Sequence, residues 1–157
     1  MYNNIQQKEI QMESATKVFC ILTVLVLLGG CATSGLKFTE LAPTISNMTP
    51  DTGRIYIYRP SSFGAAVRPD VKLNGEVIGE AISWGFFYVD RKPGNYEILT
   101  STEVDRKLSL TLDKGQSRYV RLNTGMGFFV GHVYPELVEN QVGEKEIQDC
   151  KYTGQTK

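Results

Sequence analysis

The chain has few of the residues on which most catalytic and metal chemistry depends. Its 157 residues contain one histidine, His132, and three cysteines. One histidine cannot build a multi-histidine metal site, and a serine triad would have to use this same residue. No Gly-x-Ser-x-Gly motif presents a nucleophile to it, and the paired carboxylates lie in polar segments that we expect to be solvated. We therefore predict a protein that is not an enzyme, with no catalytic residue, no metal and no cofactor.

The chain also lacks an excess of charge of either sign. It has 17 basic and 17 acidic residues, and a chain that began at Cys31 would keep 15 of each. This balance gives no electrostatic basis for binding nucleic acid. A domain of this size buries roughly two thirds of its unfolded surface, enough for a core without metals or disulfides.

No apolar run is long enough to span a membrane. The longest, residues 18–28, has 11 residues, whereas a spanning helix needs about 20 and the apolar region of a signal peptide has about 7 to 15. The run ends in Leu28-Gly29-Gly30-Cys31, which resembles the lipobox of bacterial lipoproteins. This resemblance implies that residues 1–30 are a signal peptide, cut before a lipidated Cys31. Met12 offers an alternative start, since residues 1–11 are polar.

A lipidated Cys31 predicts a membrane as partner, because two or three acyl chains make attachment effectively permanent. Ala32 follows the cysteine in place of the aspartate that retains many lipoproteins in the inner membrane. We therefore expect the periplasmic leaflet of the outer membrane. Residues 31–52 show no sustained period and predict a flexible tether that spans about 25 Å. Cys150 then has no intramolecular partner, and we favour a shielded thiol over pairing between molecules.

From Gly53 onward, short segments of alternating β-branched and aromatic residues are separated by turns that contain glycine, proline or asparagine. Asn74-Gly75 suits the positive-φ positions of a type I′ hairpin turn. The pattern predicts an all-β fold, a small antiparallel β-sandwich of seven or eight strands over residues 53–140, with a short helix in residues 141–157. The expected core is Ile55, Ile57, Val71, Leu73, Ile98, Leu108, Leu110, Leu112, Val120 and Leu122.

Four segments carry a resemblance to a family. They are residues 53–60, residues 71–80, Gly85-Phe86-Phe87 and Pro93-Gly94-Asn95-Tyr96, and over residues 52–138 the chain resembles the DUF2846 family of bacterial envelope proteins. The resemblance implies a small β-sandwich related to carboxypeptidase-regulatory and PEGA-type modules, and often a lipoprotein. It implies no activity and no catalytic residue.

These observations favour a non-enzymatic binding or structural module for an envelope protein or polysaccharide. Tyr56 and Tyr58 should lie on a half-solvated face opposite Ile55 and Ile57, and Trp84 adds a third aromatic side chain. Phe128 and Phe129, in a glycine-rich segment, form either a contact loop or part of the core. The alternative function is an envelope hydrolase or an accessory subunit of an envelope enzyme. A pocket that gathers His132 with two carboxylates or a serine would favour that alternative.

Overall fold

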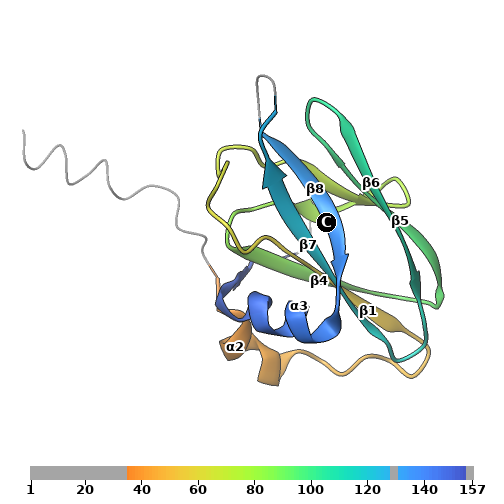
Figure 1. Ribbon diagram of the computed structural model, residues 1–157. Coiled ribbons are helices and arrows are strands. Elements are labelled where there is room, and N and C mark those ends of the chain that lie inside the picture. Colours follow the sequence, from red (N-terminus) through yellow and green to blue (C-terminus); the bar gives the residue numbers. More distant parts are fainter. Residues whose placement is uncertain (1–34, 128–130, 155–157) are drawn as a thin grey trace, which may run out of the picture. The chain divides into compact units, whose positions relative to one another are not determined.

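The computed structural model describes residues 35–127 and 131–154, which form two facing β-sheets flanked by short helices. One sheet has five strands in the order β8-β7-β1-β4-β9, and the other has four in the order β3-β2-β5-β6 (Figure 1). The first consists of β1 (Gly53–Tyr58), β4 (Gly85–Arg91), β7 (Ser117–Gly125), β8 (His132–Val138) and β9 (Lys151–Tyr152). The second consists of β2 (Asp70–Leu73), β3 (Glu76–Glu80), β5 (Gly94–Ser101) and β6 (Asp105–Leu112). The predicted β-sandwich is confirmed.

The hairpin between β2 and β3 turns where the sequence predicts it. Asn74 and Gly75 have φ angles of 49° and 88°, the left-handed values that both central positions of a type I′ turn require. The last strand of the predicted region, β8, runs from His132 to Val138.

Two strand pairs run in a direction that the sequence did not predict. β1 pairs antiparallel with β4 on one side but parallel with β7 on the other, and β4 pairs parallel with the short β9. Between β4 and β7 the chain crosses to the other sheet and forms β5 and β6 there. Alternation reports which face of a strand is buried and carries no information on its direction.

The main core lies between the sheets and agrees with the predicted list. Every predicted core residue is buried except Leu108, which is partly buried and packs against the cluster. Both inner faces contribute: Ile55 and Ile57 come from one sheet, and Leu110 and Leu112 come from the other.

The prediction that Tyr56 and Tyr58 are half-solvated is wrong. Their side chains belong to a second apolar cluster on the outer face of the five-stranded sheet, and they are 9% and 1% exposed. Tyr56 stacks on Tyr119 with ring centroids 4.9 Å apart. Two terminal segments cover this face: α2 (Phe38–Leu41), and α3 (Asn140–Glu146) with the 3-10 turn η2 (Ile147–Asp149) (Figure 1). The alternation of residues along β1 could not predict this burial, because the covering elements are distant in the sequence.

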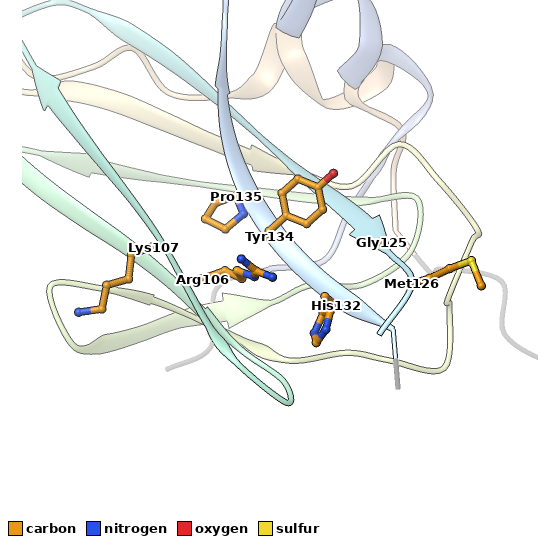
Figure 2. A pocket seen from close by; sticks show the side chains of 7 residues that line it. All are labelled: Arg106, Lys107, Gly125, Met126, His132, Tyr134 and Pro135. Carbon is orange, nitrogen blue, oxygen red and sulfur yellow. The ribbon is translucent and has the colours of Figure 1, made fainter. Parts of the chain in front are cut away.

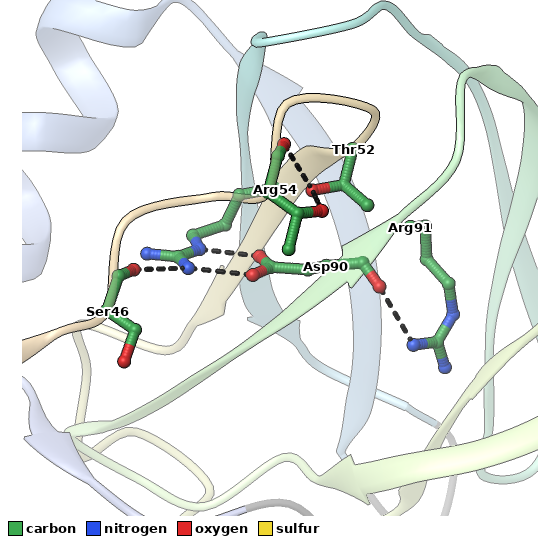
Figure 3. A network of polar contacts seen from close by, with 6 residues as sticks. Ser46, Thr52, Arg54, Asp90 and Arg91 are labelled. Atoms are coloured by element: carbon green, nitrogen blue, oxygen red, sulfur yellow. Dashed lines mark hydrogen bonds and ion pairs between the residues drawn. The ribbon is translucent and has the colours of Figure 1, made fainter.

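The predicted tether is also wrong over part of its length. Phe38, in α2, packs edge-on against the rings of Tyr56 and Phe86, at centroid distances of 5.9 and 5.3 Å. A second 3-10 turn, η1 (Ala42–Thr44), follows. Arg54 then secures the segment: its guanidinium donates to the Ser46 carbonyl at 2.9 Å and to both oxygens of Asp90 at 2.6 and 2.8 Å (Figure 3). Residues 31–34 lie outside the described residues.

The C-terminal helix is confirmed, and it explains the state of Cys150. α3 and η2 bring Ile147 and Cys150 under the outer face, both with 0% exposure. Gly143 lies so close to Tyr119 that a Cβ there would meet the tyrosine Cβ at 2.3 Å. Val142, near the start of α3, is 41% exposed. Cys150 is shielded as predicted, and no helix among the described residues is long and apolar enough to cross a membrane.

Candidate functional site

A pocket of about 410 Å³ lies on the open side of the sandwich, between β6 and β8. β6 is the edge strand of the four-stranded sheet and β8 is an edge strand of the five-stranded one. Figure 2 shows the side chains that line it: Arg106, Lys107, Gly125, Met126, His132, Tyr134 and Pro135. We call this site the β6–β8 pocket. It combines basic groups with exposed Met126 and Tyr134, which are 88% and 40% exposed.

Arg106 is the most informative residue of the β6–β8 pocket. It shares the alternation of Leu108, Leu110 and Leu112, so it occupies a core-facing register position at the end of β6 where the sandwich opens. No carboxylate in the described part of the chain lies within ion-pair distance of it. A charged residue facing inward on an edge strand also protects that edge against pairing with another chain. Its guanidinium is available to an anion.

The other two basic groups already have partners. Lys107 Nζ lies 3.1 Å from Glu97 Oε1. His132 Nδ1 lies 3.3 Å from the Thr102 hydroxyl, and its Nε2 lies 3.7 Å from Glu103 Oε2. These contacts engage both ring nitrogens and hold the imidazole in the lining of the pocket.

A second pocket, of about 570 Å³, surrounds Trp84 and is lined by Pro60, Trp84, Gln141, Val142, Lys145, Glu146 and Asp149. Trp84 is 42% exposed and has a φ of 52°, which non-glycine residues rarely adopt. Its backbone is held on both sides, because its N–H donates to the Arg59 carbonyl and its carbonyl accepts from the Lys151 N–H, at 2.9 and 2.8 Å. Contacts from the residue that follows β1 and from β9 thus fix this strained turn and leave the indole at the surface.

Comparison with known proteins gives a family. The profile of DUF2846, described as a protein of unknown function, matches residues 49–133, more than half of the chain. The chain belongs to the DUF2846 family. An uncharacterized protein of Haemophilus influenzae (strain ATCC 51907 / DSM 11121 / KW20 / Rd) is 33% identical over 131 residues, which cover 81% of this chain and 78% of that protein. No solved structure matches the chain significantly.

In this DUF2846 protein the predicted binding residues do not form one surface. Tyr56 and Tyr58 are buried, whereas Trp84 is exposed in a pocket of its own. Phe128, Phe129 and the predicted lipidation residue Cys31 lie outside the described residues. The matched region includes Arg106 and His132 and ends before Tyr134.

The hydrolase alternative requires two carboxylates or a serine beside His132. Among the described residues, one carboxylate, that of Glu103, lies within ion-pair distance of its imidazole. Glu136, four residues along β8, is instead engaged by Arg121 and Asn123 at 2.8 and 2.6 Å, and these hydrogen bonds hold the pKa of Glu136 below its usual value. Within residues 35–127 and 131–154, no group of three or more histidine, cysteine, aspartate or glutamate side chains is placed to hold a metal ion.

Sequence reasoning missed Arg106, although a signal for it exists. The alternation of β6 places leucine at positions 108, 110 and 112 and arginine at 106. A charged residue that continues a core-facing row indicates the point where a sandwich opens to solvent.

Proposed function

We propose that this protein is a lipid-anchored lipoprotein of the bacterial cell envelope, on the periplasmic leaflet of the outer membrane. There it acts as a non-enzymatic binding module that holds an anionic envelope polysaccharide in the β6–β8 pocket. The observation that carries the proposal is Arg106, a guanidinium without a carboxylate partner in the described chain, at the open side of the sandwich beside exposed Tyr134. Guanidinium groups bind carboxylates in bidentate geometry, and aromatic rings pack against sugars through their apolar faces.

Co-sedimentation with purified peptidoglycan, whose stem peptides carry carboxylates, tests the ligand. We expect Arg106→Glu to raise the apparent Kd about tenfold or more, equivalent to about 1.4 kcal/mol. Binding of the unchanged protein should weaken as salt is added.

Lys114→Glu is the matched control, because Lys114 is an exposed lysine on the turn after β6 and is absent from the pocket lining. Equal binding by Arg106→Glu and the unchanged protein would contradict the proposal. Release of soluble muropeptides would favour the hydrolase instead.

Lipidation is tested separately with Cys31→Ser. We expect this variant to lose metabolic labelling by a palmitate analogue and to accumulate as precursor, because the thiol of Cys31 is the proposed acceptor of the diacylglyceryl group, which it holds in a thioether bond. Retention of the label would exclude lipidation at this residue. Fractionation of the untagged protein with inner-membrane markers would contradict the proposed outer-membrane location.

A further inference from the structure

The chain enters the described domain at a fixed point beside β9. The Leu36 carbonyl accepts from the Tyr152 N–H at 2.8 Å, and the Phe38 N–H donates to the Cys150 carbonyl at 2.9 Å. Lys37 also forms a β-bridge with Lys151. The polypeptide is therefore held against the domain from Leu36 onward.

This fixed point limits how far the domain can lie from a lipid anchor. Four residues separate Cys31 from Leu36, and an extended chain spans at most about 3.6 Å per residue. The Cα atoms of Cys31 and Leu36 can thus be no more than about 18 Å apart. Acyl chains on Cys31 would hold the β9 edge of the domain close to the lipid headgroups.

The side chains around this point suit such a surface. Leu36 is 53% exposed. Trp84, whose carbonyl accepts a hydrogen bond from the Lys151 N–H, is 42% exposed. Val142 lies in the same pocket as Trp84 and is 41% exposed. Leu36, Trp84 and Val142 thus form the apolar part of what we call the β9-edge patch.

Three lysines complete the β9-edge patch, namely Lys37, Lys145 and Lys151. Two carboxylates also line the pocket around Trp84: Asp149 pairs with Lys37 at 3.2 Å, and Glu146 pairs with Arg121 at 2.7 Å. Lys145 and Lys151 have no ion-pair partner in the part of the chain that the structure describes. Exposed tryptophan flanked by lysine is typical of residues at the level of lipid headgroups.

We infer that the β9-edge patch rests on the phospholipid headgroup layer of the membrane in which Cys31 is anchored. The inference depends on the proposed lipidation. It also orients the binding module: β9 and β8 are opposite edges of the five-stranded sheet, separated by four strand spacings, about 19 Å. A membrane at the β9 edge therefore leaves the β6–β8 pocket facing away from the bilayer, toward the periplasm.

Trp84 is the only tryptophan of the chain, so its fluorescence reports directly on the patch. The experiment uses lipidated full protein reconstituted in vesicles of phosphatidylethanolamine and phosphatidylglycerol, with or without brominated acyl chains. We expect a blue-shifted emission maximum, and a loss of emission in the brominated vesicles. The matched control combines Trp84→Phe with Tyr134→Trp, which moves the reporter to the β6–β8 pocket and should give emission that bromine does not quench.

The outcomes separate the patch from the anchor. If the protein floats with the vesicles but Trp84 is not quenched, the inference is overturned while the lipid anchor stands, and the patch is left for a protein partner. Equal quenching of the two reporters would overturn the orientation. Failure of the protein to float would count against the proposed anchor, and the inference would fail with it.

Discussion

The hydroxyl of Tyr58 in β1 donates a 2.7 Å hydrogen bond to Glu146 in α3, across 88 positions of the chain. The other oxygen of Glu146 accepts from Arg121 of β7 at 2.7 Å. One carboxylate thus connects the C-terminal helix to two neighbouring strands. Burial, and then the contact with Glu146, raise the pKa of Tyr58 well above its usual value, so the phenol remains a donor at physiological pH.

Breaking this contact should destabilise the domain. We expect Tyr58→Phe and Glu146→Gln each to lower the free energy of unfolding by about 1 to 3 kcal/mol, because hydrogen bonds to charged groups contribute that much and a buried partner is left unsatisfied. A double-mutant cycle in urea should show coupling of about 0.5 kcal/mol or more. Strictly additive losses would show that the two side chains act independently.

Truncations should be severe in both apolar clusters, the one between the sheets and the one on the outer face of the five-stranded sheet. Leu110→Ala removes a leucine that is 5% exposed, for an expected loss of about 2 to 5 kcal/mol. Tyr56→Ala should cost a similar amount, about 3 to 5 kcal/mol, because the ring is buried against Tyr119. Urea melts followed by far-ultraviolet circular dichroism measure both. Tyr134→Ala, at an exposed site, is the control and should change stability by less than about 0.5 kcal/mol. A small loss for Tyr56→Ala would show that the outer face is open.

Arg59 should not tolerate lysine. Its guanidinium is fully buried and holds the loop after β1 by donating, at 2.7 to 2.9 Å, to the carbonyls of Phe63, Gly64, Val67 and Ala81 and to the hydroxyl of Thr124. Lysine offers three donors from a single point in place of a planar fork. We expect Arg59→Lys to cost at least about 2 kcal/mol, because several buried carbonyls lose their donor. Arg68→Lys, in the same loop but exposed, should hardly change the free energy of unfolding. Equal losses of stability in the two variants would mean that the hydrogen bonds of the buried Arg59 guanidinium are unimportant.

The thiol of Cys150 should react slowly in the native protein. Burial raises its pKa to about 12, so the reactive thiolate is roughly two-thousandfold rarer at pH 8 than for a free cysteine of pKa about 8.5. In a fragment of residues 33–157, where Cys150 is the only thiol, a disulfide reagent should label it slowly until urea is added. Fast native labelling, or a disulfide-linked dimer on a non-reducing gel, would contradict a shielded thiol.

The segment before β1 should contribute to stability. We expect residues 50–157 to be less stable than residues 35–157, because the shorter chain lacks Phe38 and the Ser46 carbonyl that Arg54 binds. Removing the cover should also increase binding of an apolar dye to the outer face. Phe38→Ala in the longer fragment should reproduce part of the loss. Equal unfolding midpoints for the two fragments would show that the segment before β1 does not stabilise the domain and acts as a flexible tether.

Local chemistry in the sequence was sufficient to predict the sandwich and its main core. Asn74-Gly75 determines a tight hairpin because both residues tolerate positive φ, and the row Leu108, Leu110 and Leu112 determines which face of β6 is buried. The same kind of argument placed the C-terminal helix. The hairpin, the buried face of β6 and the helix each depend on neighbours within a few residues, whereas the predicted shielding of Cys150 rested on its lack of a partner cysteine.

Only the tertiary structure decided what covers the second face of β1 and where the sandwich opens. The run Ile55-Tyr56-Ile57-Tyr58 is apolar at every position, which is typical of a strand buried on both faces, but the covering residues come from Phe38 and from Ile147 near the ends of the chain. The β6–β8 pocket likewise forms because two edge strands from different sheets meet at Arg106 and His132. The short-range pattern of a sequence records the periodicity of each strand, whereas contacts between distant segments depend on how the whole chain packs.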